Sequence, residues 1–349
     1  MKTLSSFVEN SPSIPSQAAW YLASIAESKG KQELFRRQSP QKLTALRQHA
    51  LIQSAVSSNR IEGVTIEPSR VATIMLGKPL LRDRNEEEVS GYREALKMVH
   101  EKGKLIEVAE PAILDLHRLA RGGTGDAGAY KEKDGDIIEK RPDGSSRVRF
   151  RTVPAAETPR CMRELVRLWQ QSMSDAKIPY MVLLAAFNLD FLCIHPFRDG
   201  NGRVSRLLML LQAYHGGLEV GRYISIERLI EENKDRYYET LEESSRNWHE
   251  GRHDPWPYIR FVLYLFKTAY QEFEEQLGRM NGKRGEKRSM IEDAIKKTIN
   301  PFSVRELEDQ CPDVSIDMIR RVLKDLQKGK KVECLGKGQS AKWQRTETN

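Results

Sequence analysis

One short polar stretch reads Ile194-His195-Pro196-Phe197-Arg198-Asp199-Gly200-Asn201-Gly202-Arg203-Val204-Ser205-Arg206. It holds an imidazole, a carboxylate, two glycines around an asparagine, and three arginines, of which Arg203 and Arg206 lie three residues apart. Apolar segments at residues 181–192 and 207–211 flank the stretch and predict two buried helices. Reactive polar residues between two buried helices indicate a binding site for phosphate.

The two glycines would let the backbone approach an anion. Gly200 and Gly202 carry no Cβ, so they allow positive φ and bring N–H groups close to a ligand. A helix is predicted to begin near Asn201, because apolar residues then recur at helical spacing. Its free N–H groups and positive dipole end would face the loop. We therefore count the start of this helix, with Val204 and Ser205, as nucleotide-binding.

The charged side chains of the stretch suit phosphate chemistry. Arg203 and Arg206 lie three residues apart and can both donate to phosphate oxygens. Asp199 can hold a divalent cation such as Mg²⁺ that bridges phosphates. His195 precedes a proline, so it lies at a bend where a neutral imidazole can act as general base. A lone His-Pro or Gly-Asn-Gly is usually a simple turn, but the whole run predicts phosphoryl or nucleotidyl transfer with His195 as the catalytic residue.

The stretch resembles the signature of the Fic family, His-x-Phe-x-(Asp/Glu)-Gly-Asn-Gly-Arg-x-x-Arg, at every position. The resemblance implies a mainly α fold, in which a Fic-type helical core carries a β-hairpin. It also implies a protein adenylyltransferase that uses ATP and Mg²⁺. His195 would take the proton from a Tyr, Thr or Ser hydroxyl of a target protein, or of the chain itself, and AMP would be transferred as pyrophosphate leaves. Phe197 would anchor the loop in the core.

A second motif ends a helix predicted at residues 41–62. It reads Ser58-x-x-x-Glu62-Gly63, and Gly63 suits the position after a helix. Glu62 puts a negative charge at the negative end of the helix, and the local sequence alone favours a solvated surface residue. The motif is similar to the (Ser/Thr)-x-x-x-Glu-(Gly/Asn) inhibitory motif of many Fic proteins. That resemblance implies that Glu62 pairs with Arg206 and denies it to the γ-phosphate of ATP.

Residues 136–153 give the clearest β signal. Two strand-like runs flank Pro142-Asp143-Gly144, which is typical of a turn, so a hairpin is expected. It could be a simple surface hairpin. In Fic proteins the corresponding hairpin is called the flap, and the resemblance implies that it pairs a segment of the target protein by strand addition. The many arginines of this flap suggest an acidic target surface.

Three further features have competing explanations. Paired aromatics such as Tyr237 and Tyr238 are most often half-buried core residues, but the resemblance implies that one of them stacks on adenine. The glycine-rich residues 122–128 lack the strand and the Gly-Lys-(Ser/Thr) of a phosphate loop and are expected to be a connector. His117 is expected to be structural, and no role is assigned to Lys131.

The C-terminal end of the chain has a different character. Residues 283–349 contain 16 Lys/Arg and 11 Asp/Glu, which gives +5 of the total net charge of +8. Three short helices followed by a strand-turn-strand tail resemble a winged helix-turn-helix. Its basic charge favours DNA binding, while protein docking or dimerisation stays open. The expected organisation is an N-terminal inhibitory segment at 1–70, a Fic core at 71–272, a linker at 273–288 and a winged helix at 289–349.

The composition of the chain also indicates the compartment in which we expect the protein. The chain has 349 residues, 39% of them hydrophobic and 30% charged, and no apolar run long enough for a membrane span. No secretory signal is expected, and four scattered cysteines without a CxxC pair suggest reduced thiols in the cytoplasm. Two other functions stay open: a DNA-binding regulator whose Fic core senses nucleotide or is inert, and transfer of another phosphate-linked group. A homodimer also stays open.

Overall fold

The computed structural model describes residues 1–38, 40–77, 80–123, 125–140, 144–280, 286–297, 301–311, 314–336 and 341–346. The chain divides into two compact units, Met1–Phe273 and Glu274–Asn349. The linker expected at 273–288 is helical at both ends, because one helix continues to Met280 and the next begins at Glu286. None of the helices in the described residues is both long and apolar enough to cross a bilayer.

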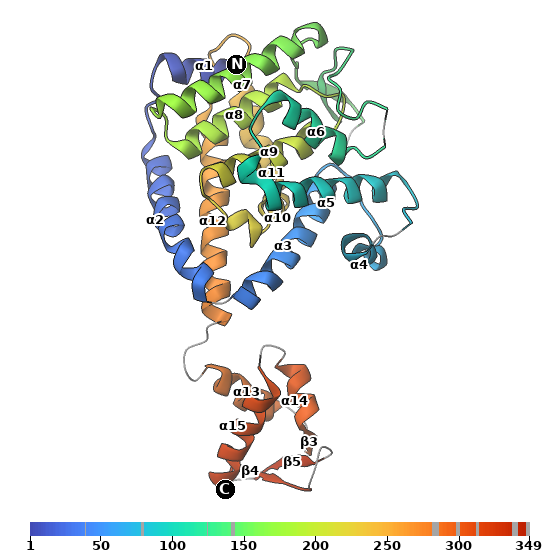
Figure 1. Ribbon diagram of the computed structural model, residues 1–349, viewed down its shortest axis with the longest axis vertical. Helices are drawn as coiled ribbons and strands as arrows, with labels where there is room; N and C mark the ends of the chain where they lie inside the picture. Colours follow the sequence, from blue (N-terminus) through green and yellow to red (C-terminus); the bar gives the residue numbers. More distant parts are fainter. Residues whose placement is uncertain are drawn as a thin grey trace. The chain divides into compact units, whose positions relative to one another are not determined.

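Unit 1 is mainly helical and carries one hairpin, so the expected fold class is confirmed (Figure 1). Its helices are α1 Lys2–Glu9, α2 Ser16–Gln38, α3 Pro40–Ile61, α4 Pro68–Leu76, α5 Arg84–Lys102, α6 Glu110–Ala120, α7 Thr158–Asp175, α8 Tyr180–Ile194, α9 Asn201–His215, α10 Ile226–Glu232, α11 Lys234–Ser245 and α12 Trp256–Met280. The hairpin pairs β1 (Ile137–Lys140) with β2 (Ser146–Phe150) in antiparallel register.

The core of unit 1 forms around α8 and α9, which the polar stretch joins. Every residue of α8 from Met181 to Ile194 is buried, as expected for a helix that is apolar on all sides. Helices α1 and α7 pack on α8, while α5 and α6 pack on α9. The loop between α8 and α9 is therefore fixed at both ends by buried helices.

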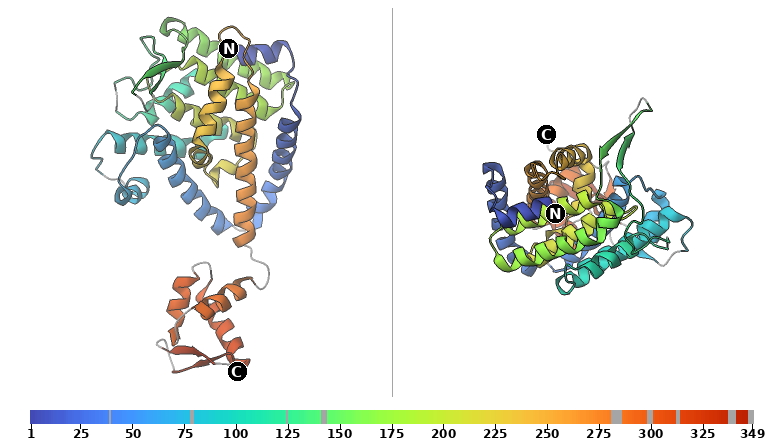
Figure 2. Two further views of the ribbon diagram at one scale, coloured as in Figure 1. Left: turned by 180° about the vertical axis from the view of Figure 1, so that it is seen from behind. Right: turned by 90° about the horizontal axis from the view of Figure 1, so that it is seen from above.

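Two buried polar side chains tie the outer helices to this core. Asp190 of α8 accepts hydrogen bonds from the N–H groups of Thr3 (3.1 Å) and Leu4 (2.9 Å), so it caps the start of α1. Gln32 of α2 accepts from the hydroxyl of Tyr270 on α12 at 2.9 Å. Helix α2 accordingly runs along α12 (Figure 2).

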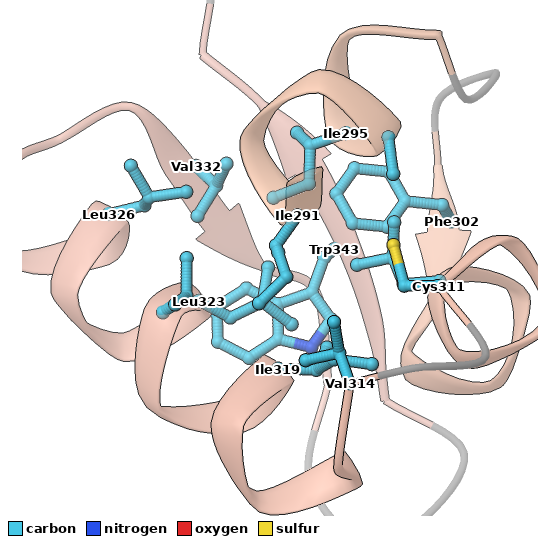
Figure 3. Packing of buried hydrophobic residues seen from close by; sticks show 13 residues of the cluster. Ile291, Ile295, Phe302, Cys311, Val314, Ile319, Leu323, Leu326, Val332 and Trp343 are labelled. Carbon is cyan, nitrogen blue, oxygen red and sulfur yellow. The ribbon is translucent and has the colours of Figure 1, made fainter. Parts of the chain in front are cut away.

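Unit 2 contains three helices and a small sheet. Its elements are α13 Glu286–Lys297, β3 Phe302–Ser303, α14 Val304–Gln310, α15 Ile316–Lys328, β4 Val332–Cys334 and β5 Lys342–Arg345. The antiparallel sheet has the order β3-β5-β4. The side chains of its core converge on Trp343 of β5 from all three helices (Figure 3). Ser303 and Glu306 form a capping box at the start of α14.

Candidate active site

The loop between α8 and α9 closes on itself through Asn201. The Asn201 side chain accepts from the N–H of Phe197 at 2.9 Å and donates to its carbonyl oxygen at 2.8 Å. Gly200 adopts φ +84°, which favours a residue without a Cβ, and it caps the start of α9. Phe197 is buried and stacks on His117, with ring centroids 3.7 Å apart. The loop is therefore rigid before any ligand binds.

His117 has the structural role expected for it. Its Nδ1 accepts from the N–H of Gly128 at 3.0 Å, so its Nε2 carries the proton and donates to the carbonyl oxygen of Asp199, also at 3.0 Å. Burial lowers the pKa of His117 to about 4, and the ring stays neutral. His117 thus ties the glycine-rich connector to the loop that follows His195.

His195 ends α8 in a left-handed conformation, with φ +52°. Its Nδ1 lies 3.3 Å from the carbonyl oxygen of Leu192, which can only accept, so Nδ1 carries the proton and the lone pair is on Nε2. Burial, together with the positive charge of Lys131, lowers the pKa of His195 to about 4. The imidazole is therefore a neutral base at pH 7, and it lines a cavity of about 200 Å³.

Glu62 lies against the first turn of α9. A Cβ built on Gly202 would be only 2.1 Å from Oε1 of Glu62, so the carboxylate occupies the space that the glycine leaves open. Arg206 donates to the same Oε1 at 2.8 Å. Arg206 also donates to the hydroxyl of Ser58 (2.8 Å) and to its carbonyl oxygen (2.9 Å), while Gly63 follows with φ +81°. The pair between Glu62 and Arg206 that the resemblance implies is thus present.

Arg203 is held by a residue that sequence reasoning did not single out. Its Nη1 donates to Oε2 of Glu88 at 2.6 Å, and both side chains are almost fully buried. Oε1 of Glu88 accepts from Arg121 and from Arg84, each at 2.9 Å. One buried carboxylate therefore orients three guanidinium groups beside the loop. The only signal in the sequence is the run of glutamates at 86–88, which looks like an ordinary solvated helix start.

Asp199 is the one residue predicted to bind a metal. Its side chain is half exposed, with Oδ1 accepting from the N–H of Gly200 (2.6 Å) and Oδ2 from Arg121 (2.6 Å). The described residues contain no cluster of three or more His, Cys, Asp or Glu side chains that could hold a metal ion. A single exposed carboxylate fits Mg²⁺ only where phosphates and water supply the other ligands.

The cavity beside His195 is bounded by the loop, the hairpin and α11. Tyr238 is half-buried and lies under the guanidinium of Arg149, 5.1 Å from its ring centroid. Tyr237 also lines the cavity but is 3% exposed and packs on Tyr258 and Phe261 of α12. Tyr238 is accordingly the more accessible aromatic surface for a base.

Of the residues predicted to bind nucleotide, Gly202, Tyr237 and Tyr238 line this cavity. The others do not line it: Gly200, Asn201, Arg203, Val204, Ser205 and Arg206. Val204 is fully buried, and its N–H donates to the carbonyl oxygen of Gly200 at 3.0 Å within the helix. The buried hydroxyl of Ser205 donates to the carbonyl oxygen of Gly202 at 2.8 Å. Both side chains point into the core because a helix that begins at Asn201 turns these positions inward. Both side chains fix α9 in the core, and the nucleotide-binding role of these two positions stays a prediction.

Two arginines of the hairpin, Arg147 and Arg149, form ion pairs within the protein. Arg147 contacts Glu139 and lies 3.0 Å from Glu242 of α11, and Arg149 lies 3.5 Å from the same carboxylate. These pairs neutralise part of the positive charge that suggested an acidic target surface. Residues 141–143, in the turn of the expected hairpin, lie outside the described residues. Ile138 and Val148 are 59% and 51% exposed, so the outer face of the hairpin is apolar.

Lys131 contacts the residues before and after His195, although no role was expected for it. Its N–H donates to the carbonyl oxygen of Pro196 at 2.9 Å. Its buried Nζ donates to the carbonyl oxygen of Ile194 (3.2 Å) and to the hydroxyl of Thr152 (2.8 Å), just after β2. Burial lowers the pKa of Lys131 to about 8. This lysine therefore joins the end of the hairpin to the peptide bonds on either side of His195.

In unit 1, surrounding helices hold a loop that begins at His195 and leads into α9, whose N-cap is Gly200. This arrangement matches a Fic-type helical fold. Residues 107–213 match the sequence model of the Fic/DOC family. The chain therefore carries a Fic/DOC domain. It is 29% identical over 225 residues to "Protein adenylyltransferase Fic" of Nematostella vectensis, a match that covers 61% of this chain and 46% of that protein. The chain thus spans about half the length of that curated relative.

Solved structures share this fold. A Fic family protein of Desulfovibrio desulfuricans G20 superposes with a TM-score of 0.62 at 21% identity, covering 97% of this chain and 98% of that one. A Fic domain containing signaling protein of Bacteroides thetaiotaomicron gives 0.59 at 20% identity, covering 73% and 96%. Fic-1 (aa134 - 508) of C. elegans gives 0.57 at 20% identity, covering 75% and 73%. At these identities the likeness concerns the fold.

Proposed function

We propose that this chain is a protein adenylyltransferase that transfers AMP from ATP to a Tyr, Thr or Ser hydroxyl of a target protein or of itself. One observation carries the proposal. The neutral imidazole of His195 lines the same cavity as Gly202, at the start of α9. A general base is thus placed beside a helix start that can take phosphate. The adenylyltransferase name of the Nematostella relative supports the same chemistry.

The chain's own residues supply the steps of the reaction. N–H groups at the start of α9 and the guanidinium groups of Arg203 and Arg206 hold the phosphates. Asp199 would hold Mg²⁺, which neutralises phosphate charge when bound. Nε2 of His195 takes the proton of the target hydroxyl as its oxygen attacks the α-phosphorus. The bond between the α-phosphorus and the bridging oxygen breaks, pyrophosphate leaves, and the proton on His195 returns to water.

Glu62 keeps this site in an inactive state. Its carboxylate lies on Gly202, where phosphate would bind, and it is the ion-pair partner of Arg206. A phosphate there would meet both a steric overlap and a like charge. The cavity of about 200 Å³ is also smaller than the roughly 300–1,000 Å³ of most ligand sites. Withdrawal of Glu62 would enlarge it toward α9 and free Arg206 for the γ-phosphate.

The hairpin would present the target. Ile138 and Val148 expose apolar side chains on strands whose other ends approach His195, since Ile137 and Phe150 line the cavity. An extended segment of a target could add to this two-stranded edge and bring a hydroxyl to Nε2 of His195. Tyr238 would then face the adenine, because its half-buried ring closes the α11 side of the cavity.

The test uses ATP labelled on the α-phosphate. Glu62→Gly should incorporate label into the chain or into lysate proteins far above the wild type, and adding His195→Ala should abolish it. Label that arrives only from γ-labelled ATP would favour transfer of phosphate instead of AMP. No incorporation by Glu62→Gly from any labelled nucleotide would favour a nucleotide sensor or an inert core, and the enzyme proposal would then fail.

A further inference from the structure

Unit 2 has the chain order of a nucleic-acid-binding fold. Helix α13 is followed by β3, then α14 and α15, then the hairpin of β4 and β5, and β5 lies in the middle of the sheet. Three helices followed by a two-stranded hairpin is the order of a winged helix-turn-helix. In helix-turn-helix proteins the second helix of the motif enters the major groove, and α15 holds that position here.

The inner face of α15 packs in the hydrophobic core of unit 2. Ile319, Val322, Leu323 and Leu326 are buried together with Val332 and Trp343 (Figure 3). The opposite face carries Asp317, Arg321, Lys324 and Lys328 at spacings of four, three and four residues, and all four are exposed. These spacings place them in one stripe along the helix. The outward face of α15 is therefore a row of charges that the fold itself does not need.

The cations of this row have no carboxylate partner within the part of the chain that the structure describes. Among the described residues, no ion pair involves Arg321, Lys324 or Lys328, whereas Arg320 lies 3.8 Å from Asp317. Exposed lysines continue the row past the end of α15 at Lys330 and Lys331. Helix α14 is acidic by comparison, since it carries Glu306 and Glu308. The outward face of α15 and the two lysines before β4 thus carry five cations and one carboxylate, Asp317.

We infer that unit 2 binds duplex DNA through the outward face of α15. Lysine and arginine side chains along a helix about 10–12 Å wide fit a major groove about 12 Å wide, where they reach phosphates on its edges. Asp317, in the first turn, lies where such helices contact base edges, and a carboxylate can accept from the amino group of cytosine. The lysines before β4 extend the phosphate contacts beyond the groove.

A protein partner fits this face less well. The large apolar side chains exposed in the described part of unit 2 are Met290 and Leu335, and neither lies on α15. Protein interfaces have an apolar centre with few charged residues, which the stripe of Arg321, Lys324 and Lys328 does not provide. Duplex DNA requires the reverse, a row of unpaired cations. This inference is independent of the transferase proposal.

The test measures binding of the full chain to a fluorescent random-sequence duplex as salt is raised from about 50 to 200 mM. The variant R321A/K324A/K328A should bind more weakly at low salt, and its slope of log K against log salt should be shallower by about 2–3, since each phosphate contact contributes about 0.9. The matched control K97A/K102A/K177A removes three exposed lysines of unit 1 and should keep the wild-type slope. Circular dichroism checks that both variants stay folded.

A second variant separates base readout from phosphate contact. Asp317→Asn should keep the salt slope and change the preference among duplexes that differ in their cytosines. Three results would overturn the inference: no duplex binding by the wild type at 50 mM salt, equal slopes in the wild type and the α15 variant, or equal losses in both triple variants. In the first two cases unit 2 is a protein-docking module, and in the third any DNA contact reflects net charge alone.

Discussion

Oε1 of Glu62 occupies the place that a side chain on Gly202 would take, 2.1 Å from an ideal Cβ. The same oxygen accepts from Arg206 at 2.8 Å. One carboxylate thus covers both the backbone and the guanidinium that we assign to phosphate binding. The space that Gly202 leaves open holds the carboxylate of Glu62 in this structure, and under our proposal a phosphate would take the same space.

Gly202→Ala in a Glu62→Gly background should give a folded but inactive protein. With Glu62 absent, the new Cβ has Arg206 as its nearest contact at 3.2 Å, and alanine suits a helix better than glycine by about 0.5–1 kcal/mol. The methyl group nevertheless fills the approach of phosphate to α9. We expect an unchanged or raised melting temperature with α-phosphate labelling reduced at least about tenfold from Glu62→Gly alone. Equal labelling in the two proteins would show that phosphate does not bind at this turn.

Glu62→Gln should destabilise the protein and make it sensitive to ATP. Arg206 is buried, and an amide oxygen can still accept its hydrogen bond but no longer balances its charge. Because Glu62 is 29% exposed, water softens the loss, and we expect about 1–3 kcal/mol. Thermal unfolding with and without ATP measures the effect, and ATP should raise the melting temperature of the variant more than that of the wild type. The matched control is Glu231→Gln, whose partner Arg60 is exposed and whose loss should be within about 0.5 kcal/mol.

The order of residues in one stretch was enough to predict the loop and its helix. Asn201 begins α9 as expected, and Gly200 takes positive φ, because these properties follow from local sequence. The polarity of Arg203 and Arg206 also suggested their importance. It did not show that both guanidinium groups are buried, since burial depends on helices far away in the chain.

The contacts of Glu88 and Lys131 could not be predicted from the neighbouring sequence. A glutamate near the start of a helix is usually solvated, and it is the packing of α5 on α9 that brings Glu88 to Arg203. A lysine after a glycine-rich connector likewise has no local signature. Its side chain gains a role because the hairpin returns the chain to the end of α8, which brings Thr152 and Ile194 within hydrogen-bonding distance.

Labelling by Glu62→Gly should be independent of pH from about 8 down to 5 and fall below that. Burial lowers the pKa of His195 to about 4, so the base is neutral above this value and becomes protonated as the pH falls through it. The measurement is kcat/KM against pH, with the α-phosphate label as readout. An acid limb near the ordinary histidine pKa of 6.5 would mean that the imidazole is more hydrated than its position in α8 indicates.

The same burial should make folding sensitive to acid. His117 and His195 are neutral in the folded protein, with pKa values lowered from 6.5 to about 4 in each case. The unfolded chain therefore binds more protons between pH 6.5 and 4, so the free energy of unfolding should fall as the pH is lowered through this window. His117→Gln should reduce the slope when unfolding by urea is followed at pH 7, 6 and 5. An unchanged slope would contradict the assignment of a buried neutral ring to His117.

Lys131→Met should move the acid limb of this pH profile upward as well as slow the reaction. The positive charge of Lys131 helps to lower the pKa of His195, second only to burial, so its removal lets that pKa rise toward 6.5. The variant also loses the hydrogen bonds to Ile194 and Thr152, which should loosen the hairpin end and lower kcat about tenfold by misplacing His195. Lys131→Arg keeps the charge and should keep the acid limb near pH 4 even if kcat falls. A residue that served only packing would lower the melting temperature in Lys131→Met and leave the pH profile in place, so the two variants together separate positioning from packing.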